Sequence, residues 1–204
     1  MASTWRRVDS FDTVYSADSV EWCPFEPNQN IFACGTYQVK TEECVERLGK
    51  VFLFKEESGK LVLLQTIESP AVLDMKWNPK LVHDLILLGV VDTKGQLTVY
   101  HLTDLRLHEL CSLSLRPEDC VGDFLALSLD WSPPHNGLIA VSDSLGGVHL
   151  VKLENSSMTV LNTFKGHDLE AWIVVFDAHK PLLFSGKSEM GQGHRYPKTL
   201  VLIS

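Results

Sequence analysis

The chain has 204 residues, 45% of them hydrophobic and 22% charged, and its formal net charge at pH 7 is −8. These proportions are typical of a globular protein that is long enough to bury a sizeable core. The negative charge argues against nucleic acid and anionic membrane surfaces as partners. The longest apolar run, residues 85–91, is too short for a helix that crosses a bilayer. We therefore expect a protein that binds neither nucleic acid nor membranes.

The cysteines indicate neither a disulfide framework nor a metal site. There are five of them, an odd number, and none of the spacings is C-x-x-C: Cys23, Cys34, Cys44, Cys111 and Cys120. Cys23 and Cys34 fall in apolar, strand-like segments and are interpreted as small core residues. Together these features favour a reducing compartment, and we expect a cytoplasmic protein without a metal ion or cofactor.

A repeat organises the sequence. Three segments end in W-x-P, with Trp22, Trp77 and Trp131 separated by 55 and 54 residues, and Phe176 takes the tryptophan position in a fourth copy 45 residues later. Apolar and polar residues alternate within these segments, which is the pattern of a strand with one buried face. The tryptophans are therefore predicted to be core residues.

Each copy is followed by the same order of elements. Second strands are predicted at 31–37, 85–91, 138–142 and 182–185, third strands at 51–55, 97–102 and 148–153, and fourth strands at 61–67, 107–115 and 158–164. Between the second and third strands of the middle copies lie the tight turns 92–95 and 143–146, each opened by Asp and closed by Gly. Asp bonds its own backbone in such turns, and Gly supplies the positive φ.

Four short antiparallel strands recurring at this period predict an all-β fold, a WD-type β-propeller. The blades are expected at about 17–69, 70–115, 124–164 and 166–186, which makes three and a half. They would form the N-terminal portion of an unclosed ring, with residues 187–204 as a divergent tail outside any regular blade. The absence of long helical patterns between the strands argues against a βαβ fold. Strand count alone leaves a β-sandwich open, although the repeat disfavours it.

One loop carries a candidate catalytic constellation. Residues 166–172 read Gly-His-Asp-Leu-Glu-Ala-Trp and enter the inner strand of the fourth blade. His167 would act as a general base, with Asp168 or Glu170 orienting its ring to activate water on an ester. The alternative is structural, because the His of a WD-repeat G-H pair normally bonds within its own blade and Asp at such a turn is ordinarily a cap.

Other polar residues carry weaker hypotheses. Three inner-strand carboxylates occupy related positions and could line a central channel, although alternation alone also places polar residues there: Glu21, Asp74 and Asp130. Three histidines fall in predicted loops and are interpreted as solvated: His83, His135 and His179.

Several segments together resemble the diphthine methylesterase family, WD-repeat proteins of diphthamide biosynthesis. They include Ala-Asp-Ser-Val-Glu-Trp-Cys-Pro at 17–24, Ala-Cys-Gly-Thr-Tyr-Gln at 33–38 and His-Asp-Leu-Glu-Ala-Trp-Ile at 167–173. The last two are not general features of WD repeats. The resemblance runs in order from about residue 14 to Gly186.

The resemblance implies an enzyme that hydrolyses the methyl ester of methylated diphthine on elongation factor 2, giving diphthine and methanol. It implies elongation factor 2 as partner and no cofactor, and it assigns no catalytic residue. It also implies further blades beyond Gly186, so a form without activity is one alternative. A non-enzymatic WD-repeat interaction scaffold is the other, because fold alone does not give function.

Overall fold

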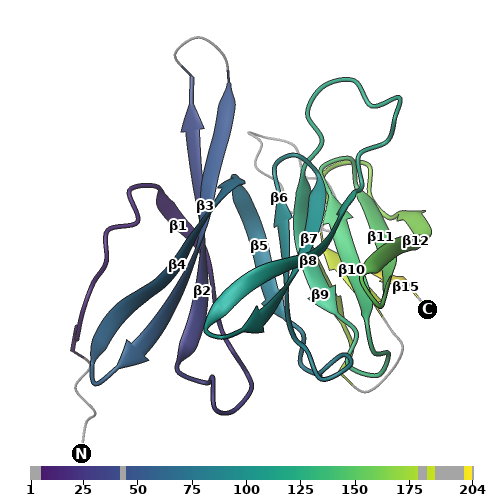
Figure 1. Ribbon diagram of the computed structural model, residues 1–204. Coiled ribbons are helices and arrows are strands. Elements are labelled where there is room, and N and C mark those ends of the chain that lie inside the picture. Colours follow the sequence, from purple (N-terminus) through teal and green to yellow (C-terminus); the bar gives the residue numbers. More distant parts are fainter. Residues whose placement is uncertain (1–5, 42–44, 179–182, 187–199, 204) are drawn as a thin grey trace, which may run out of the picture.

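The computed structural model describes residues 6–41, 45–178, 183–186 and 200–203, and every regular element in these ranges is a strand. The strands form four antiparallel sheets that follow one another along the chain (Figure 1). We call these sheets blades 1 to 4. Blade 1 contains β1 (Ser16–Trp22), β2 (Ile31–Lys40), β3 (Glu46–Glu57) and β4 (Lys60–Pro70). Blade 2 contains β5 (Val72–Trp77), β6 (Ile86–Asp92), β7 (Gln96–Thr103) and β8 (Arg106–Ser114).

Blades 3 and 4 repeat this plan. Blade 3 contains β9 (Ala126–Trp131), β10 (Leu138–Asp143), β11 (Gly147–Glu154) and β12 (Ser157–Lys165). Blade 4 contains β13 (Ile173–Phe176), β14 (Leu183–Gly186) and β15 (Leu200–Ile203) within the described residues. In each blade the strands pair in chain order, and the first strands β1, β5, β9 and β13 contact one another in sequence as the inner strands. The predicted all-β partial propeller is confirmed.

The predicted tight turns have the expected chemistry. Gly95 and Gly146 adopt φ values of 73° and 82°, in the left-handed region that favours glycine. The Asp143 carboxylate accepts hydrogen bonds from the backbone N–H groups of Leu145 (2.7 Å) and Gly147 (2.8 Å). Asp92 does the same for Lys94 and Gln96 in its own turn. These turns fix the register of the strands that they join.

The core lies between blades. Trp77 and Met75 of β5 face blade 1 and pack in one cluster with its Ile31 and Leu53. In the same phase of the next inner strands, Trp131 and Leu129 pack against blade 2, and Val174 and Phe176 pack against blade 3. The Trp side of each inner strand therefore faces the preceding blade.

Trp22 is a correction to the sequence prediction. It was expected in the core, but its side chain is 52% exposed, whereas Trp77 and Trp131 are 6% and 2% exposed. The reason is that Trp22 lies on the face that, in blades 2 and 3, packs against the neighbouring blade, and no other described blade packs on this face of blade 1. Trp22 instead contacts Phe32 of its own blade, with ring centroids 4.8 Å apart.

The C-terminal segment also differs from expectation. Residues 187–204 were predicted to lie outside any regular blade, yet Leu200–Ile203 pair with β14 as the third strand of blade 4. The apolar run at these positions has the β-propensity that an edge strand needs, although it carries no Trp-Asp signature. Residues 187–199 lie outside the described residues.

The cysteine and membrane predictions can be compared with the described chain. Cys23 and Cys34 are buried, as expected, and with Cys111 and Cys120 they are free thiols. Cys44 and His179 lie outside the described residues. No helix among the described residues is long and apolar enough to cross a membrane.

Candidate functional site

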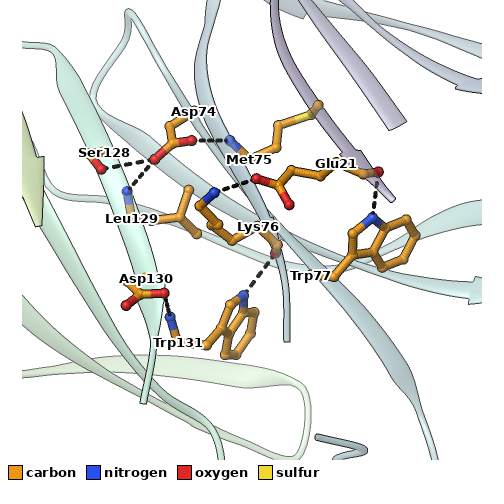
Figure 2. Close-up of polar contacts among 9 residues, drawn as sticks. All are labelled: Glu21, Asp74, Met75, Lys76, Trp77, Ser128, Leu129, Asp130 and Trp131. Atoms are coloured by element: carbon orange, nitrogen blue, oxygen red, sulfur yellow. Dashed lines mark hydrogen bonds and ion pairs between the residues drawn. The ribbon is translucent and has the colours of Figure 1, made fainter. Parts of the chain in front are cut away.

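Polar side chains of the inner strands join neighbouring blades (Figure 2). Asp74 of β5 accepts hydrogen bonds from the Ser128 hydroxyl (2.9 Å) and the Leu129 N–H (3.0 Å) of β9. The ammonium group of Lys76, also on β5, forms an ion pair with Glu21 of β1. Blade 2 is therefore tied through charged side chains to the blades on both of its sides.

Asp130 makes the corresponding contact one blade further on. Its carboxylate accepts a hydrogen bond from the Phe176 N–H of β13 at 2.7 Å and another from the Trp131 N–H of its own strand at 3.0 Å. Glu21, Asp74 and Asp130, for which the sequence left open a place along a channel, each bond a residue of a neighbouring blade. Alternation along each strand predicted their face, but not their partners.

The pKa values of these charged inner-strand residues reflect their partial burial. Burial raises the pKa of the Asp74 and Asp130 carboxyls, against the lowering effect of the N–H groups that bond them. Burial lowers the pKa of Lys76, but the hydrogen bond and charge of Glu21 outweigh it, and the net shift is upward. Lys76 is therefore firmly protonated, while both aspartates hold their charge less readily than exposed ones.

The structure places the predicted catalytic residues on one loop but gives them different environments. His167 is buried, with 5% of its surface exposed, and its Nε2 lies 2.8 Å from the Ser185 hydroxyl of β14. Asp168 is exposed and Glu170 is half-buried. The Ser185 contact lies within blade 4, as the structural alternative for the Gly-His pair expects. Ser185 is fully buried, so little of this pair is in contact with solvent.

Sequence reasoning missed a second histidine site, in blade 3. His149 of β11 bonds Asp143 through Nε2 (2.7 Å) and Thr163 of β12 through Nδ1 (3.0 Å). His149 and Asp143 are 5% and 3% exposed, whereas Thr163 is exposed. Burial raises the Asp143 pKa, but the bonds from His149 and the turn amides outweigh it, so the net pKa lies below the ordinary value. The only sequence signal was a histidine six residues after a turn aspartate.

The His149 and His167 sites lie at the same end of the blades. The Gly146 carbonyl of the turn that Asp143 opens accepts hydrogen bonds from the N–H groups of Gly166 (3.0 Å) and His167 (3.1 Å). The turn of blade 3 and the loop into blade 4 are thereby held together. This end of the blades carries two hydroxyl–imidazole pairs, one of them backed by a carboxylate.

A recess of about 390 Å³ lies at the opposite end of the blades. It is lined by the loop of blade 2 that carries His83 and, in blade 3, by the loop that carries Asn136 and by Lys152 and Glu154 at the end of β11. His83 and His135 are both exposed in these loops, as the sequence predicted. No group of His, Cys, Asp and Glu in the described part of the chain has the geometry to hold a metal ion.

Comparison with curated proteins gives the chain its family. It is 33% identical to human diphthine methyltransferase over 213 residues, covering 88% of this chain and 46% of the human protein. The mouse protein of the same name is also 33% identical, covering 91% and 44%, and a Dictyostelium discoideum homologue is 36% identical, covering 84% and 52%. The chain belongs to the diphthine methyltransferase family. It spans about half the length of these relatives. No family model matches it.

Solved structures agree with the fold of this family member. Sqt1 from Chaetomium thermophilum superimposes with a TM-score of 0.62 at 20% identity, covering 82% of this chain and 40% of Sqt1. A second Sqt1 structure, bound to the N-terminus of ribosomal protein L10, gives a TM-score of 0.61. The computationally designed Ika4 protein gives 0.62 at 13% identity, with 98% of both chains covered. At these identities the likeness concerns the fold alone.

Proposed function

We propose that the protein acts in diphthamide biosynthesis, hydrolysing the methyl ester of methylated diphthine on elongation factor 2 to diphthine and methanol. The kinship with diphthine methyltransferases, at 33–36% identity over more than four fifths of the chain, supports the role in diphthamide biosynthesis. The hydrolysis of the ester is the finer part of the proposal, and it rests on the resemblance of the sequence segments described above. In the reaction, water adds to the ester carbonyl, the bond from that carbon to the methoxy oxygen breaks, and the oxygen leaves with a proton as methanol.

The residues proposed for this chemistry are those of the loop into blade 4. His167 would accept the proton of the attacking water, and Glu170 or Asp168 would support its charge. The geometry weakens the assignment of His167, because its ring is buried and its Nε2 already bonds Ser185. Glu170 is closer to the surface than His167, and its carboxylate belongs to the same loop.

The mass of elongation factor 2 tests the reaction. The chain is incubated with factor that carries methylated diphthine, and the modified peptide is weighed before and after. Ester hydrolysis lowers its mass by one CH₂ unit and releases methanol, whereas methyl transfer onto diphthine raises the mass of an unmethylated substrate by the same unit. An unchanged mass at high enzyme concentration ends the hydrolase proposal for this chain.

Two variants test the residue assignment. We expect Glu170→Ala to lower the hydrolysis rate by about 100-fold if Glu170 supports the base. His167→Ala is compared at equal folded fraction, because it also removes the bond to Ser185. Unchanged rates in both variants remove this loop from the mechanism.

A second candidate function is a binding platform without chemistry. It is favoured by the likeness of fold to Sqt1, one of whose structures holds the N-terminus of a ribosomal protein. A platform would bind elongation factor 2 without changing its mass. Binding measured in the same mixtures therefore separates the two functions.

A further inference from the structure

A carboxylate, an imidazole and a hydroxyl group form a chain of hydrogen bonds in blade 3. Nε2 of His149 lies 2.7 Å from the Asp143 carboxylate, and Nδ1 of the same ring lies 3.0 Å from the Thr163 hydroxyl. Asp143 and His149 are buried, whereas Thr163 is exposed on the outer strand β12. A molecule in solution can therefore meet the hydroxyl, while the two groups behind it are fixed by the packing of the blade.

The carboxylate sets the direction of both hydrogen bonds. The net pKa of Asp143 lies below its ordinary value, so the group is ionised at neutral pH and only accepts. Nε2 of His149 therefore carries the proton that bonds Asp143. In the neutral ring Nδ1 then has no proton, and it accepts the hydrogen bond of the Thr163 hydroxyl. A base beside a hydroxyl, itself oriented by a carboxylate, is the arrangement that activates a nucleophile.

The carboxylate is held in place from its other side. Oδ1 of Asp143 accepts the N–H groups of Leu145 and Gly147, which leaves Oδ2 for His149. The His149 ring also meets the ring of Phe124 edge-on, with centroids 6.4 Å apart. The imidazole is thereby oriented toward Thr163 before any substrate binds.

The fold does not require an imidazole at this position. Blade 2 makes the same kind of turn at Asp92, whose carboxylate also bonds the turn amides. In its outer strands the register places Thr98 opposite Ser112, where blade 3 has His149 opposite Thr163. Because the turn and the strand pair form without a histidine in blade 2, His149 is available for a role in chemistry.

We propose that Thr163 is a nucleophile that cleaves carboxylic esters, with His149 as its general base and Asp143 as the residue that positions this base. Thr163 Oγ1 adds to the ester carbonyl carbon as its proton passes to Nδ1 of His149. The bond from that carbon to the alcohol oxygen breaks, and the alcohol leaves with the proton from His149. Water then adds to the acyl group and gives a proton to His149, which returns it to Thr163 Oγ1 as the carboxylic acid departs.

The surroundings of the hydroxyl suit this reaction. Thr163 and Lys165 are two residues apart on β12 and therefore share one face of the strand. The ammonium group of Lys165 donates to the Leu145 carbonyl in the turn that Asp143 opens. A cation thus lies on this face for the negative charge that develops on the ester carbonyl oxygen. The site is distinct from the His167 loop, and its activity toward a simple ester does not depend on elongation factor 2.

Acylation by p-nitrophenyl acetate tests the proposal. Release of p-nitrophenolate by the full chain gives the rate, and peptide masses after an acid quench locate the acetyl group, which we expect on Thr163. Hydroxylamine removes an acetyl group from a hydroxyl but not from a lysine, so the two kinds of adduct are separated. Thr163→Val should abolish this adduct. Thr159→Val is the matched control, because Thr159 is also exposed on β12 but pairs with Lys152, and it should react like the wild type.

Two variants test the groups behind the hydroxyl. His149→Gln, compared at equal folded fraction, should lower the rate at least 100-fold, because an amide does not accept the proton. In Asp143→Asn the rising limb of rate against pH should move to lower pH, because the protonated ring loses the carboxylate that stabilises it. A residue that only braced the turn would leave this limb where it is.

The ester-cleaving site is refuted by any of three results. They are release of p-nitrophenolate by Thr163→Val at the wild-type rate, acetyl groups spread equally over Thr163 and Thr159, and an unmoved pH limb in Asp143→Asn. The first two need no change to a buried residue, so they decide the question even if the variants of His149 and Asp143 do not fold.

Discussion

Replacing Trp131 with Phe tests whether the indole hydrogen bond and its packing hold blades 2 and 3 together. Trp131 is 2% exposed, and its N–H donates to the Lys76 carbonyl at 2.9 Å. Losing that bond costs about 1 kcal/mol. The two ring carbons that Phe lacks cost about 0.8 kcal/mol each in buried apolar surface. The free energy of unfolding should therefore fall by about 2.5 kcal/mol, more if the space left behind does not close.

Thermal and urea unfolding measure this loss. For a chain of this size the melting temperature should drop by roughly 5–10 °C. Trp172→Phe is the matched control, because Trp172 is 50% exposed and its change should stay within about 0.5 kcal/mol. The reasoning is refuted if the two variants lose equal stability, or if Trp131→Phe is as stable as the wild type.

Two further predictions concern the turn that opens at Asp143. Gly146→Ala should lower the melting temperature far more than Gly122→Ala, although both glycines have positive φ. A Cβ added at Gly146 would lie 2.2 Å from the carbonyl oxygen of His167 and 2.4 Å from that of Leu169. A Cβ added at Gly122 would have no atom within 4 Å. We expect Asp143→Asn to have a lower free energy of unfolding than the wild type. The difference should have its full size above pH 3.8, the ordinary carboxyl pKa, and should shrink as the pH falls through the lower pKa that Asp143 has in the folded chain. Circular dichroism during urea unfolding across the acid range measures both curves, and a deficit independent of pH contradicts the second prediction.

The strands and turns were predictable because their signals are local. Alternation in the segments that end at Trp77 and Trp131 indicates a strand with one buried face, and the residue pattern of the turn at Asp143 is sufficient to specify its geometry. These signals placed most second, third and fourth strands within a few residues of their observed bounds.

The sequence did not predict the contacts between blades. Trp22 has the same local pattern as Trp77, yet it is 52% exposed, because no other described blade packs on its face as blade 1 packs on that of Trp77. The bond from Ser128 to Asp74 joins residues 54 positions apart, and no pattern within either strand names its partner. In the candidate site, the Gly-His motif located the His167 loop, but whether a buried imidazole serves catalysis or structure depends on packing that motifs do not encode.

The direction of the indole hydrogen bonds has a consequence for how the chain is made. Trp77 and Trp131 each find their acceptor in the blade that precedes them in sequence, so the acceptor has already left the ribosome when the donor emerges. Blade 1 can therefore serve as a template for blade 2, and blade 2 for blade 3, during synthesis. Assembly can follow the order of translation, and no blade has to wait for a later one to complete the interface that it shares with its predecessor.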